Sequence, residues 1–416
     1  RDPLEGGWKT IGANTPGIGW YNATNIMNLP GGSSVGWGLT EFNPDRDWVT
    51  AVHDLDQVAG ESNVVFRVAI ASSGNQGLNN QGFAFDNVRI KERSKLAVLE
   101  HFTDNTDDRS RQADDKLDAL VKKNSKDVID LQYHMSTYGL DPMNRNNPDP
   151  SSTRAFNYGV PSVPYTVLDG GQTPQYRYDL SSPEAGPVED HLRLRTLELP
   201  EFEIDLSVDW LRNSMEVQTT VRCVTDRFDD YIQLYIVVFE TSVTAYTGSN
   251  GDKHFRNVVL DMLPTPAGKL LGKDWRKGKT DSRSNTWIYK SYVEDIEELA
   301  VVAFVQDRAT GQILQAAMDH KDETVGFLNP ETKAQGLHIY PNPAHATLYV
   351  NLGEKTNLSG RIELLDVNGK LVHAEQVPAG YQVIQLNVEQ LNKGIYILRW
   401  TASGQVRGVS KLVKTR

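Results

Sequence analysis

The stretch that decides the fold of the central part of the chain lies at residues 159–170 and reads Gly-Val-Pro-Ser-Val-Pro-Tyr-Thr-Val-Leu-Asp-Gly. Its second proline leads directly into Tyr165–Leu168, a short apolar run that ends at Asp-Gly, so we expect a buried strand there. Upstream, Leu96–Glu100 and Val128–Tyr133 read as two further buried strands. Between these two, Ser110–Asn124 carries apolar residues at the spacing of an amphipathic helix. The order strand, helix, strand, and strand after a proline predicts an α/β core.

Several phrases in and around this core carry a family resemblance. Val98-Leu-Glu-His-Phe-Thr103, Tyr133-His134, Asp141-Pro142 and the 159–170 stretch resemble the thioredoxin-like outer-membrane proteins of the Bacteroidota. The resemblance continues into a β-rich half through Ala300-Val-Val-Ala-Phe-Val-Gln306 and Ile313-Leu-Gln-Ala-Ala317. It implies a thioredoxin-like domain over residues 93–187 and a β-sandwich extension over residues 188–326.

The residues at the position of the family's dithiol argue against redox chemistry. In thioredoxin-like enzymes the attacking cysteine stands at a helix N-terminus, where the helix dipole stabilises its thiolate. Alignment on the Phe-Thr pair at 102–103 puts Asp107 and Ser110 at the two cysteine positions, and neither can exchange a disulfide. The lone Cys223 permits no internal disulfide either. Asp107 suits a helix cap instead, and Pro164, at the family's cis-proline position, is expected to shape the turn.

Composition excludes several functional classes. The 416 residues include 43 Lys and Arg against 54 Asp and Glu, a net charge of −11, whereas nucleic-acid binding needs a clustered excess of basic side chains. The acidity also disfavours electrostatic adhesion to anionic membranes. The longest apolar runs, such as Tyr231–Phe239, fall well short of the roughly 20 residues that a transmembrane helix needs. At roughly 100 to 200 residues per domain, the length predicts about three domains.

The first 92 residues are rich in Gly, Asn and Trp and predict short antiparallel strands. The strand-like runs are Trp8–Ile11, Trp48–Val52, Val64–Ile70 and Phe83–Ile90. The closing phrase Gln81-Gly-Phe-Ala-Phe-Asp-Asn-Val-Arg-Ile90 resembles the last strands of choice-of-anchor J jelly-rolls, which are related to MAM domains. The resemblance implies a partial jelly-roll over residues 1–92, with chain missing in front of Arg1. Similar jelly-rolls place structural Ca²⁺ beside loop carboxylates, so Asp86 is either a calcium ligand or a strand-end cap.

Four tryptophans of this region form a candidate ligand surface. They are Trp8, Trp20, Trp37 and Trp48. Exposed indole rings stack on sugar faces or anchor a partner protein, whereas most tryptophans of a sandwich belong to its core. Both interpretations stay open, and a surface glycan is the ligand that the first one implies.

Acidic and histidine side chains of the α/β region suggest metal sites only weakly. The carboxylates at Asp104, Asp107, Asp108, Asp114 and Asp115 could hold Ca²⁺, but no calcium-loop pattern is present, so a solvated acidic helix start is the preferred interpretation. His101 and His134 come close if the first two strands pair, yet no third ligand stands at a metal-site spacing. We expect both histidines to have structural partners or to be exposed.

The last 80 residues change in character once more, after a polar linker at residues 327–336. An Asn-Gly turn at 368–369 between two apolar runs predicts a β-hairpin, and short alternating strands predict a small Ig-like sandwich over residues 337–416. This segment resembles a type A C-terminal sorting domain of the type IX secretion system. The residues that would form or pin the sorting signal are Pro341, Asn342, Pro343, Gly369, Gly394, Tyr396, Lys411 and Lys414.

Together these features predict a multi-domain, mainly β protein with one α/β domain. Its parts would be a partial jelly-roll, a thioredoxin-like core with a β-sandwich extension, and a C-terminal Ig-like sandwich. The expected function is a non-enzymatic structural or adhesive protein that passes through the periplasm to the outer-membrane cell surface or the medium. The expected partners are the type IX translocon and the outer-membrane shuttle and attachment machinery. Two alternatives are a self-assembling surface filament or layer, and a carbohydrate-binding accessory part of a larger secreted hydrolase.

Overall fold

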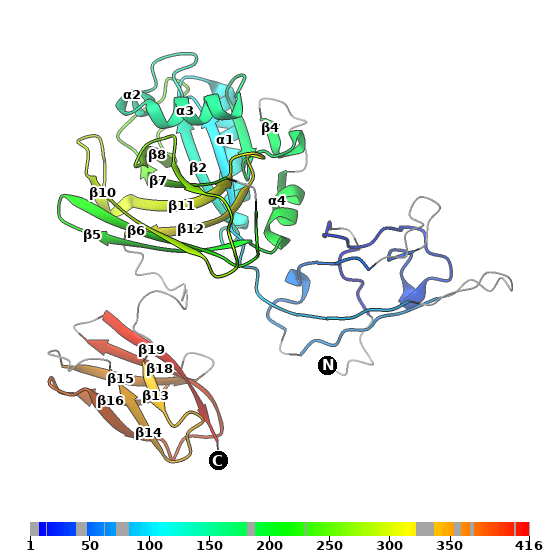
Figure 1. Cartoon of the computed structure of the whole chain (residues 1–416), viewed down its shortest axis with the longest axis vertical. Coiled ribbons are helices and arrows are strands. Elements are labelled where there is room, and N and C mark those ends of the chain that lie inside the picture. Colours follow the sequence, from blue (N-terminus) through cyan, green and yellow to red (C-terminus); the bar gives the residue numbers. More distant parts are fainter. Residues whose placement is uncertain are drawn as a thin grey trace. The chain divides into compact units, whose positions relative to one another are not determined.

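Figure 1 shows the computed structural model of the 416-residue chain. The structure describes residues 8–13, 15–38, 48–61, 63–71, 83–180, 188–228, 231–321, 337–352, 359–366, 370–402 and 405–415. The chain divides into two compact units, Arg1–Asp322 and Glu323–Arg416, and each is described by itself. Within the ranges given above, no helix is long and apolar enough to cross a membrane. The predicted linker at residues 327–336 lies outside the described residues.

The first unit contains an α/β core. Its elements are β1 (Ala97–Thr103), α1 (Asp108–Lys123), β2 (Val128–His134), α2 (Pro142–Asn146), α3 (Asp149–Tyr158), β3 (Tyr165–Leu168), β4 (Arg177–Asp179) and α4 (Val188–Leu197). β1 and β2 are parallel, β3 is antiparallel to β1, and β4 is antiparallel to β3, which gives the order β2-β1-β3-β4. These are the order and directions of a thioredoxin-like core, so the fold predicted for this part of the chain is confirmed.

The sheet of this core is covered on both faces, which explains why its strands read as continuous apolar runs. All seven residues of β1 and all seven of β2 are buried. On one face Leu99 packs with Leu117 of α1 and Leu192 of α4. On the other face Phe102 packs with Ala155 of α3. The sheet is therefore the middle of three layers, with α1 and α4 on one side and α3 on the other (Figure 1).

The β-rich half that follows continues the same sheet. Its strands are β5 (Phe202–Trp210), β6 (Ser214–Cys223), β7 (Ile232–Val243), β8 (Phe255–Leu263), β9 (Lys269–Gly272), β10 (Thr280–Ile288), β11 (Leu299–Asp307) and β12 (Ile313–His320). β8 pairs in parallel with β2, giving a nine-stranded sheet of order β12-β11-β7-β8-β2-β1-β3-β4, with β9 beside β7. β8 therefore extends the α/β sheet, and α4 packs on the α/β core through Leu192. The predicted division between residues 93–187 and 188–326 stays a prediction.

A second, smaller sheet completes the predicted sandwich. Its order is β10-β6-β5, and it shares a large apolar core with the extended half of the main sheet. Met215 and Val217 of β6 belong to the same buried cluster as Val238 of β7 and Val301 of β11. Trp275 is fully buried in this cluster. Apolar side chains that alternate along β6 thus face the main sheet, as expected for a two-sheet sandwich.

The region before the core has little regular structure. Between Trp8 and Ser94 the described residues contain two single-turn 3₁₀ helices, at Pro30–Gly32 and Asp56–Val58, and isolated bridges, but no strand. The strands predicted over Val64–Ile70 and Phe83–Ile90 are not formed, and their side chains are exposed. An alternating run becomes a strand only when a neighbouring strand completes its hydrogen bonds. The runs at 8–11 and 48–52 also form no strand, and the partial jelly-roll over residues 1–92 stays a prediction.

A buried ionic cluster fastens the start of β1 to the rest of the core. The carboxylate of Asp169 accepts hydrogen bonds from Lys95 Nζ at 2.6 Å and Arg195 Nε at 2.9 Å. Its second oxygen accepts the backbone N–H of Val98 at 2.8 Å. All three side chains are nearly inaccessible to solvent. Because buried charges persist only when paired and hydrogen-bonded, this cluster fixes the end of β3, the start of β1 and α4 in one arrangement.

Glu240 in β7 gives the fold a pH dependence. It is 1% exposed and accepts the backbone N–H of Asp295 at 2.5 Å. Burial is the main cause that raises the pKa of Glu240 to about 7, and the nearby carboxylates of Glu294 and Asp295 add to it. A carboxyl group whose pKa is higher in the folded than in the unfolded chain stabilises the fold at low pH. That stabilisation is lost as the pH rises from the unfolded pKa through the folded one.

We therefore expect Glu240→Gln to stabilise the protein at pH 8 but not at pH 4. The gain at pH 8 should be about 2 kcal/mol after allowance for solvent screening, measured as the difference in free energy of unfolding from urea titrations. The exposed Glu216 of β6 provides a matched control, Glu216→Gln. A gain that is the same at both pH values would contradict the assignment to Glu240.

The second unit is a two-sheet sandwich. Its strands are β13 (His338–Tyr340), β14 (Thr347–Asn351), β15 (Gly360–Asp366), β16 (Leu371–Val377), β17 (Val383–Asn387), β18 (Gly394–Ala402) and β19 (Gln405–Lys414). They form sheets of order β13-β14-β17 and β16-β15-β18-β19. Leu348, Leu364, Leu398 and Trp400 are among the buried residues of its own core. The predicted β15–β16 hairpin forms, whereas its turn at 368–369 lies outside the described residues.

Candidate functional site

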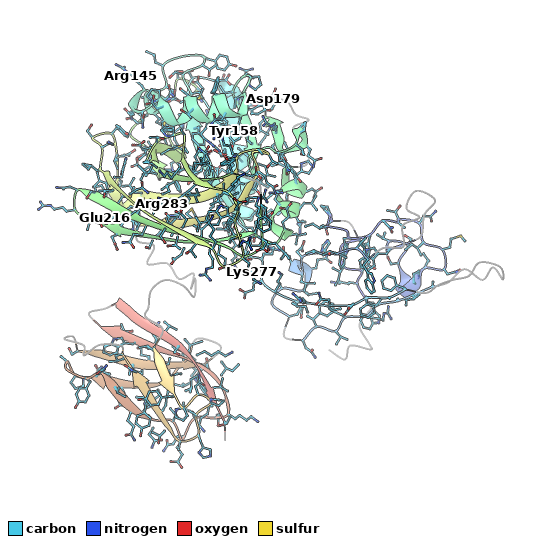
Figure 2. All side chains as sticks on the ribbon, in the orientation of Figure 1. Arg145, Tyr158, Asp179, Glu216, Lys277 and Arg283 are labelled. Carbon is cyan, nitrogen blue, oxygen red and sulfur yellow. The ribbon has the colours of Figure 1, made fainter. Side chains whose placement is uncertain are left out.

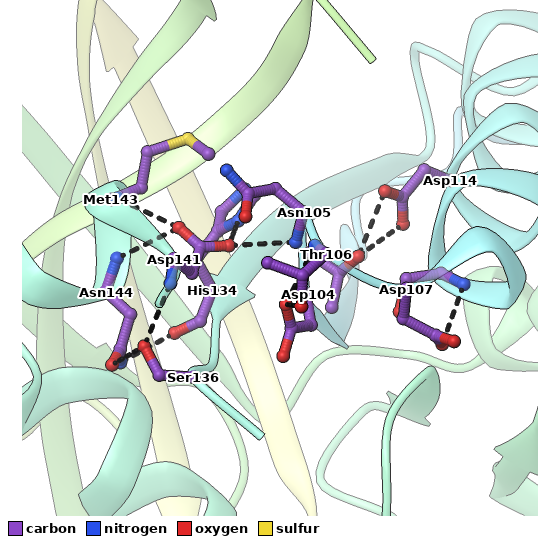
Figure 3. Close-up of polar contacts among 12 residues, drawn as sticks. Asp104, Asn105, Thr106, Asp107, Asp114, His134, Ser136, Asp141, Met143 and Asn144 are labelled. Carbon is purple, nitrogen blue, oxygen red and sulfur yellow. Dashed lines mark hydrogen bonds and ion pairs between the residues drawn. The ribbon is translucent and has the colours of Figure 1, made fainter. Parts of the chain in front are cut away.

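The position of the family's dithiol is occupied by a helix cap. It lies after β1, at the start of α1, where parallel strands of an α/β sheet usually present ligand sites. Asp107, at the start of α1, is its N-cap (Figure 3). Its carboxylate accepts from Ser110 N and Ser110 Oγ, both at 3.2 Å. Ser110 is fully buried. The predicted capping role of Asp107 is thus confirmed, and both residues are used for local structure.

Pro164, predicted at the family's cis-proline position, is linked to this cap through Tyr138 and Arg109. The Val163–Pro164 peptide bond is cis and precedes β3 directly. Tyr138 connects the two features, because its hydroxyl donates to the Val163 carbonyl at 3.4 Å and its ring lies 5.1 Å from the Arg109 guanidinium. Arg109 in turn donates to Asp107 at 3.0 Å. The contacts described around Asp107 thus serve local structure: hydrogen bonds from Ser110 and Arg109, and the contact of Arg109 with the Tyr138 ring.

The only cysteine lies in another part of the unit. Cys223 ends β6 and is buried. Burial raises the pKa of its thiol, and its Sγ donates to the Thr225 carbonyl at 2.9 Å. A raised pKa lowers the fraction of thiolate, which is the reactive form. Cys223 is therefore unsuited to thiol chemistry.

His101 and His134 lie on neighbouring strands, as predicted, but each has its own carboxylate. Thr103 stands opposite His134 in the β1–β2 ladder. His101 is fully buried between Thr166 Oγ1 and Asp114 Oδ1, each at 2.7 Å from a ring nitrogen. His134 Nδ1 lies 2.8 Å from Asp141 Oδ2. The predicted structural role of the two histidines is thus confirmed.

The ion pair of His134 and Asp141 shifts both pKa values. Burial works against the charged imidazolium, but the adjacent Asp141 carboxylate outweighs it, so the pKa of His134 is raised. Burial likewise works against the Asp141 carboxylate, but His134 and backbone N–H donors outweigh it and lower the pKa of Asp141. Each partner thus favours the charged form of the other, and the pair holds the end of β2 against the loop before α2.

Asp104 departs from the prediction of a solvated acidic cluster. It is fully buried, and its carboxylate accepts from Thr106 N at 2.9 Å, Thr137 N at 2.8 Å and Tyr138 N at 3.0 Å. Asp141 binds the neighbouring backbone in the same way, through Asn105 N at 2.9 Å and Met143 N at 2.9 Å (Figure 3). For Asp104 the prediction is wrong, because loop N–H groups replace the water that a carboxylate normally needs.

A larger ionic cluster lies on the other face of the sheet and was not predicted. Arg154 of α3 donates to both oxygens of Glu100 in β1, at 2.8 and 2.7 Å, and to Gln306 of β11 at 3.1 Å. The Tyr158 hydroxyl bridges the same arginine and glutamate. The guanidinium also lies 4.5 Å from the centre of the Tyr235 ring. This cluster ties the α/β core to the β-rich half.

No metal centre is visible in the described residues. Within them, no three His, Cys, Asp or Glu side chains are arranged to hold an ion. Asp86 is exposed, and its carboxylate accepts the backbone N–H of Asn87 at 2.5 Å. Because no strand forms over residues 83–90, this contact is a local turn contact and not a strand-end cap. Calcium at Asp86 stays a prediction.

The candidate tryptophan surface divides into packed and exposed members. Trp20 and Trp37 contact each other with ring centres 4.9 Å apart, and Trp37 stacks on Phe83 at 6.2 Å. The Trp8 ring carries the Arg67 guanidinium 4.1 Å from its centre. Trp48 is 71% exposed. The structure therefore brings Trp20 and Trp37 together in one cluster and leaves Trp48 as the most exposed indole.

In the second unit the predicted sorting residues come together from both ends of the segment. Asn342, between two cis prolines at 341 and 343, donates to the Lys411 carbonyl at 2.7 Å and accepts the Val413 N–H at 2.8 Å. Lys414 is 2% exposed, and its ammonium group donates to the Thr415 carbonyl at 2.7 Å. Its strand partner is Gly394.

The remaining sorting residues complete this arrangement. The Tyr396 hydroxyl donates to the Asn392 carbonyl at 2.8 Å, which fixes the loop before β18. Gly369 lies outside the described residues. The predicted residues at 341–343 and 411–414 thus form a single junction between the first and last parts of this unit.

Comparison with known proteins identifies this unit. Residues 338–415 match the family described as the secretion system C-terminal sorting domain. No curated protein matches the chain.

Two solved structures of Porphyromonas gingivalis proteins are similar to the chain. HBP35 is 16% identical with a TM-score of 0.45, and the match covers 77% of this chain and 99% of that one. A domain of the outer membrane lipoprotein Omp28 is 11% identical with a TM-score of 0.20, covering 30% of this chain and 91% of the other. The family match places a type IX secretion sorting domain at residues 338–415, and the protein is therefore exported to the cell surface or the extracellular space.

Proposed function

We propose that this protein is a non-enzymatic structural or adhesive body on the cell surface. The observation that supports this most directly is the helix cap at the dithiol position, where Asp107 binds Ser110. A thioredoxin-like core without its dithiol still provides a stiff α/β layer. The buried clusters around Asp169 and Arg154 join this layer to the β-rich half. A rigid body of this kind suits the presentation of surfaces outside the cell.

An insulin-reduction assay tests the absence of redox activity. We expect the full-length protein to reduce insulin no faster than dithiothreitol alone, because neither Asp107 nor Ser110 can form a mixed disulfide. An active thioredoxin serves as the positive control, and Cys223→Ser as the matched variant. Turnover above background that Cys223→Ser abolishes would refute the non-enzymatic proposal.

Self-assembly into a surface filament or layer is the second candidate. The observation in its favour is the set of exposed apolar side chains at Phe66, Ile70, Phe85 and Ile90, on stretches that form no strand in the described region. Unpaired apolar segments add readily to strands of another chain. Electron microscopy of the purified protein tests this: ordered filaments or sheets would support assembly, and monodisperse particles at high concentration would reject it.

Binding to a surface glycan is a further candidate function, and the exposed side chain of Trp48 is the observation in its favour. Its exposed indole can stack on a sugar ring. A glycan array with the full-length protein, compared with Trp48→Ala, tests this directly. Binding that the variant retains unchanged would exclude Trp48 as the contact.

A further inference from the structure

The outer face of one sheet in the sorting domain carries a continuous apolar stripe. Along the β16-β15-β18-β19 sheet, Leu365 stands opposite both Leu371 and Ile397. Two residues before Ile397 in β18, and on the same face of the sheet, Ile395 stands opposite Val413. We call these five residues the apolar stripe. Lys411 stands opposite Ile397 and so lies at the edge of the stripe.

These side chains point away from the core of the unit. Along β18, Tyr396 and Leu398 are buried while Ile395 and Ile397 between and beside them are not. Leu371 is 42% exposed and Ile395 is 44% exposed. An apolar row on a solvated sheet face is unfavourable in water and commonly marks an interaction site.

Elsewhere on the exterior, apolar and polar side chains are mixed, and Val383 and Tyr340 of the other sheet are also exposed. Further along the same face, Arg399 forms an ion pair with Glu363 at 2.6 Å. On the outer face of the other sheet, Tyr349 stands opposite Gln385 and Thr347 opposite Asn387. The two lysines near the C-terminus also differ, because Lys414 is buried whereas Lys411 is exposed. Lys414 is thus placed to support folding, and Lys411 to meet a partner.

We propose that the apolar stripe and Lys411 form the surface by which the type IX secretion machinery binds this domain. The partner would present an apolar face with an acidic side chain opposite Lys411. This inference rests on the export route assigned above. It is favoured because the stripe lies within the matched sorting segment. It also runs onto β19, the strand that Asn342 joins to the sorting residues near residue 341.

Export of full-length variants from a bacterium with a type IX system tests the proposal. Ile395→Asn combined with Ile397→Asn removes the middle of the stripe, and Lys411→Glu reverses its charge. Both should lower the surface-to-periplasm ratio by about tenfold or more, as expected for loss of a central interface contact. The control is Val383→Asn with Gln385→Glu on the other sheet, which should export normally.

Thermal unfolding of each purified variant separates recognition from folding. Lys411→Glu should shift the Tm by less than about 2 °C, since it is a surface change. The isoleucine variant should lower the Tm by several degrees, because asparagine is disfavoured in strands. If the isoleucine variant unfolds, the export of Lys411→Glu alone tests the proposal. Normal export of folded Lys411→Glu and of the folded isoleucine variant would overturn the proposal. The proposal would also be overturned if these changes dissociated a dimer without affecting export. In that case a second copy of the chain, and not the secretion machinery, would bind the apolar stripe. Failure of the export route itself would show separately, as normal export of a chain without residues 337–416.

Discussion

A chain that lacks residues 337–416 is expected to be folded and to stay in the periplasm. The deletion removes the matched sorting segment and leaves the first unit complete, because Arg1–Asp322 and Glu323–Arg416 have separate cores. Surface labelling with an impermeant reagent should fall to background while the periplasmic fraction gains the truncated protein. The effect should be all-or-none, since the deletion removes the whole of the matched segment.

A fusion provides the matched control for this deletion. Residues 323–416 attached to a periplasmic reporter should carry the reporter to the surface, because this unit contains its own buried core. The same fusion with the Asn342→Ala substitution should be exported less efficiently, since Asn342 joins the first and last parts of the unit. Normal surface display of the truncated protein would contradict the export route.

The sequence predicts the α/β core well because its signals are local. The β3 strand occupies the predicted Tyr165–Leu168, and α1 begins two residues before the predicted Ser110. An apolar run before Asp-Gly and an amphipathic spacing depend on the residues of the element itself. The junction of β2 with β8 depends instead on residues more than 100 positions apart, at Gln132 and Val258. No local pattern reports such a pairing, so the continuation of the α/β sheet through β8 could not be predicted from the sequence.

The sequence predicts which residues form the candidate site better than it predicts the contacts that these residues make. The capping role of Asp107 follows from residue type at a helix start. Burial of Asp104 does not, because it depends on backbone N–H groups contributed by Thr137 and Tyr138 of a distant loop. A signal for the Arg154 cluster did exist: Glu100 interrupts the apolar run of β1, and a charge at a buried strand position requires a partner. What the sequence lacks is the identity of that partner.

Replacement of Arg154 by Met is expected to have the largest effect on stability of any single change considered. Arg154 and Glu100 are almost completely buried, and their pairing is bidentate. Removing one partner leaves an uncompensated charge on Glu100, which typically costs about 3–5 kcal/mol. For a unit of this size that corresponds to a Tm lower by about 10 °C. Differential scanning calorimetry of the full-length protein measures it, with separate transitions expected for the two units.

Two further variants show whether the uncompensated charge is the cause. Arg145→Met changes an arginine at the periphery, in α2, whereas Tyr158 of the Arg154 cluster lies within the body of the unit (Figure 2). Arg145→Met should leave the Tm unchanged within about 2 °C. Combining Arg154→Met with Glu100→Gln removes both charges and should recover part of the lost stability, because no unpaired carboxylate remains. A double variant that is less stable than the sum of the single changes predicts would show that packing around Tyr235, and not charge, dominates the cluster.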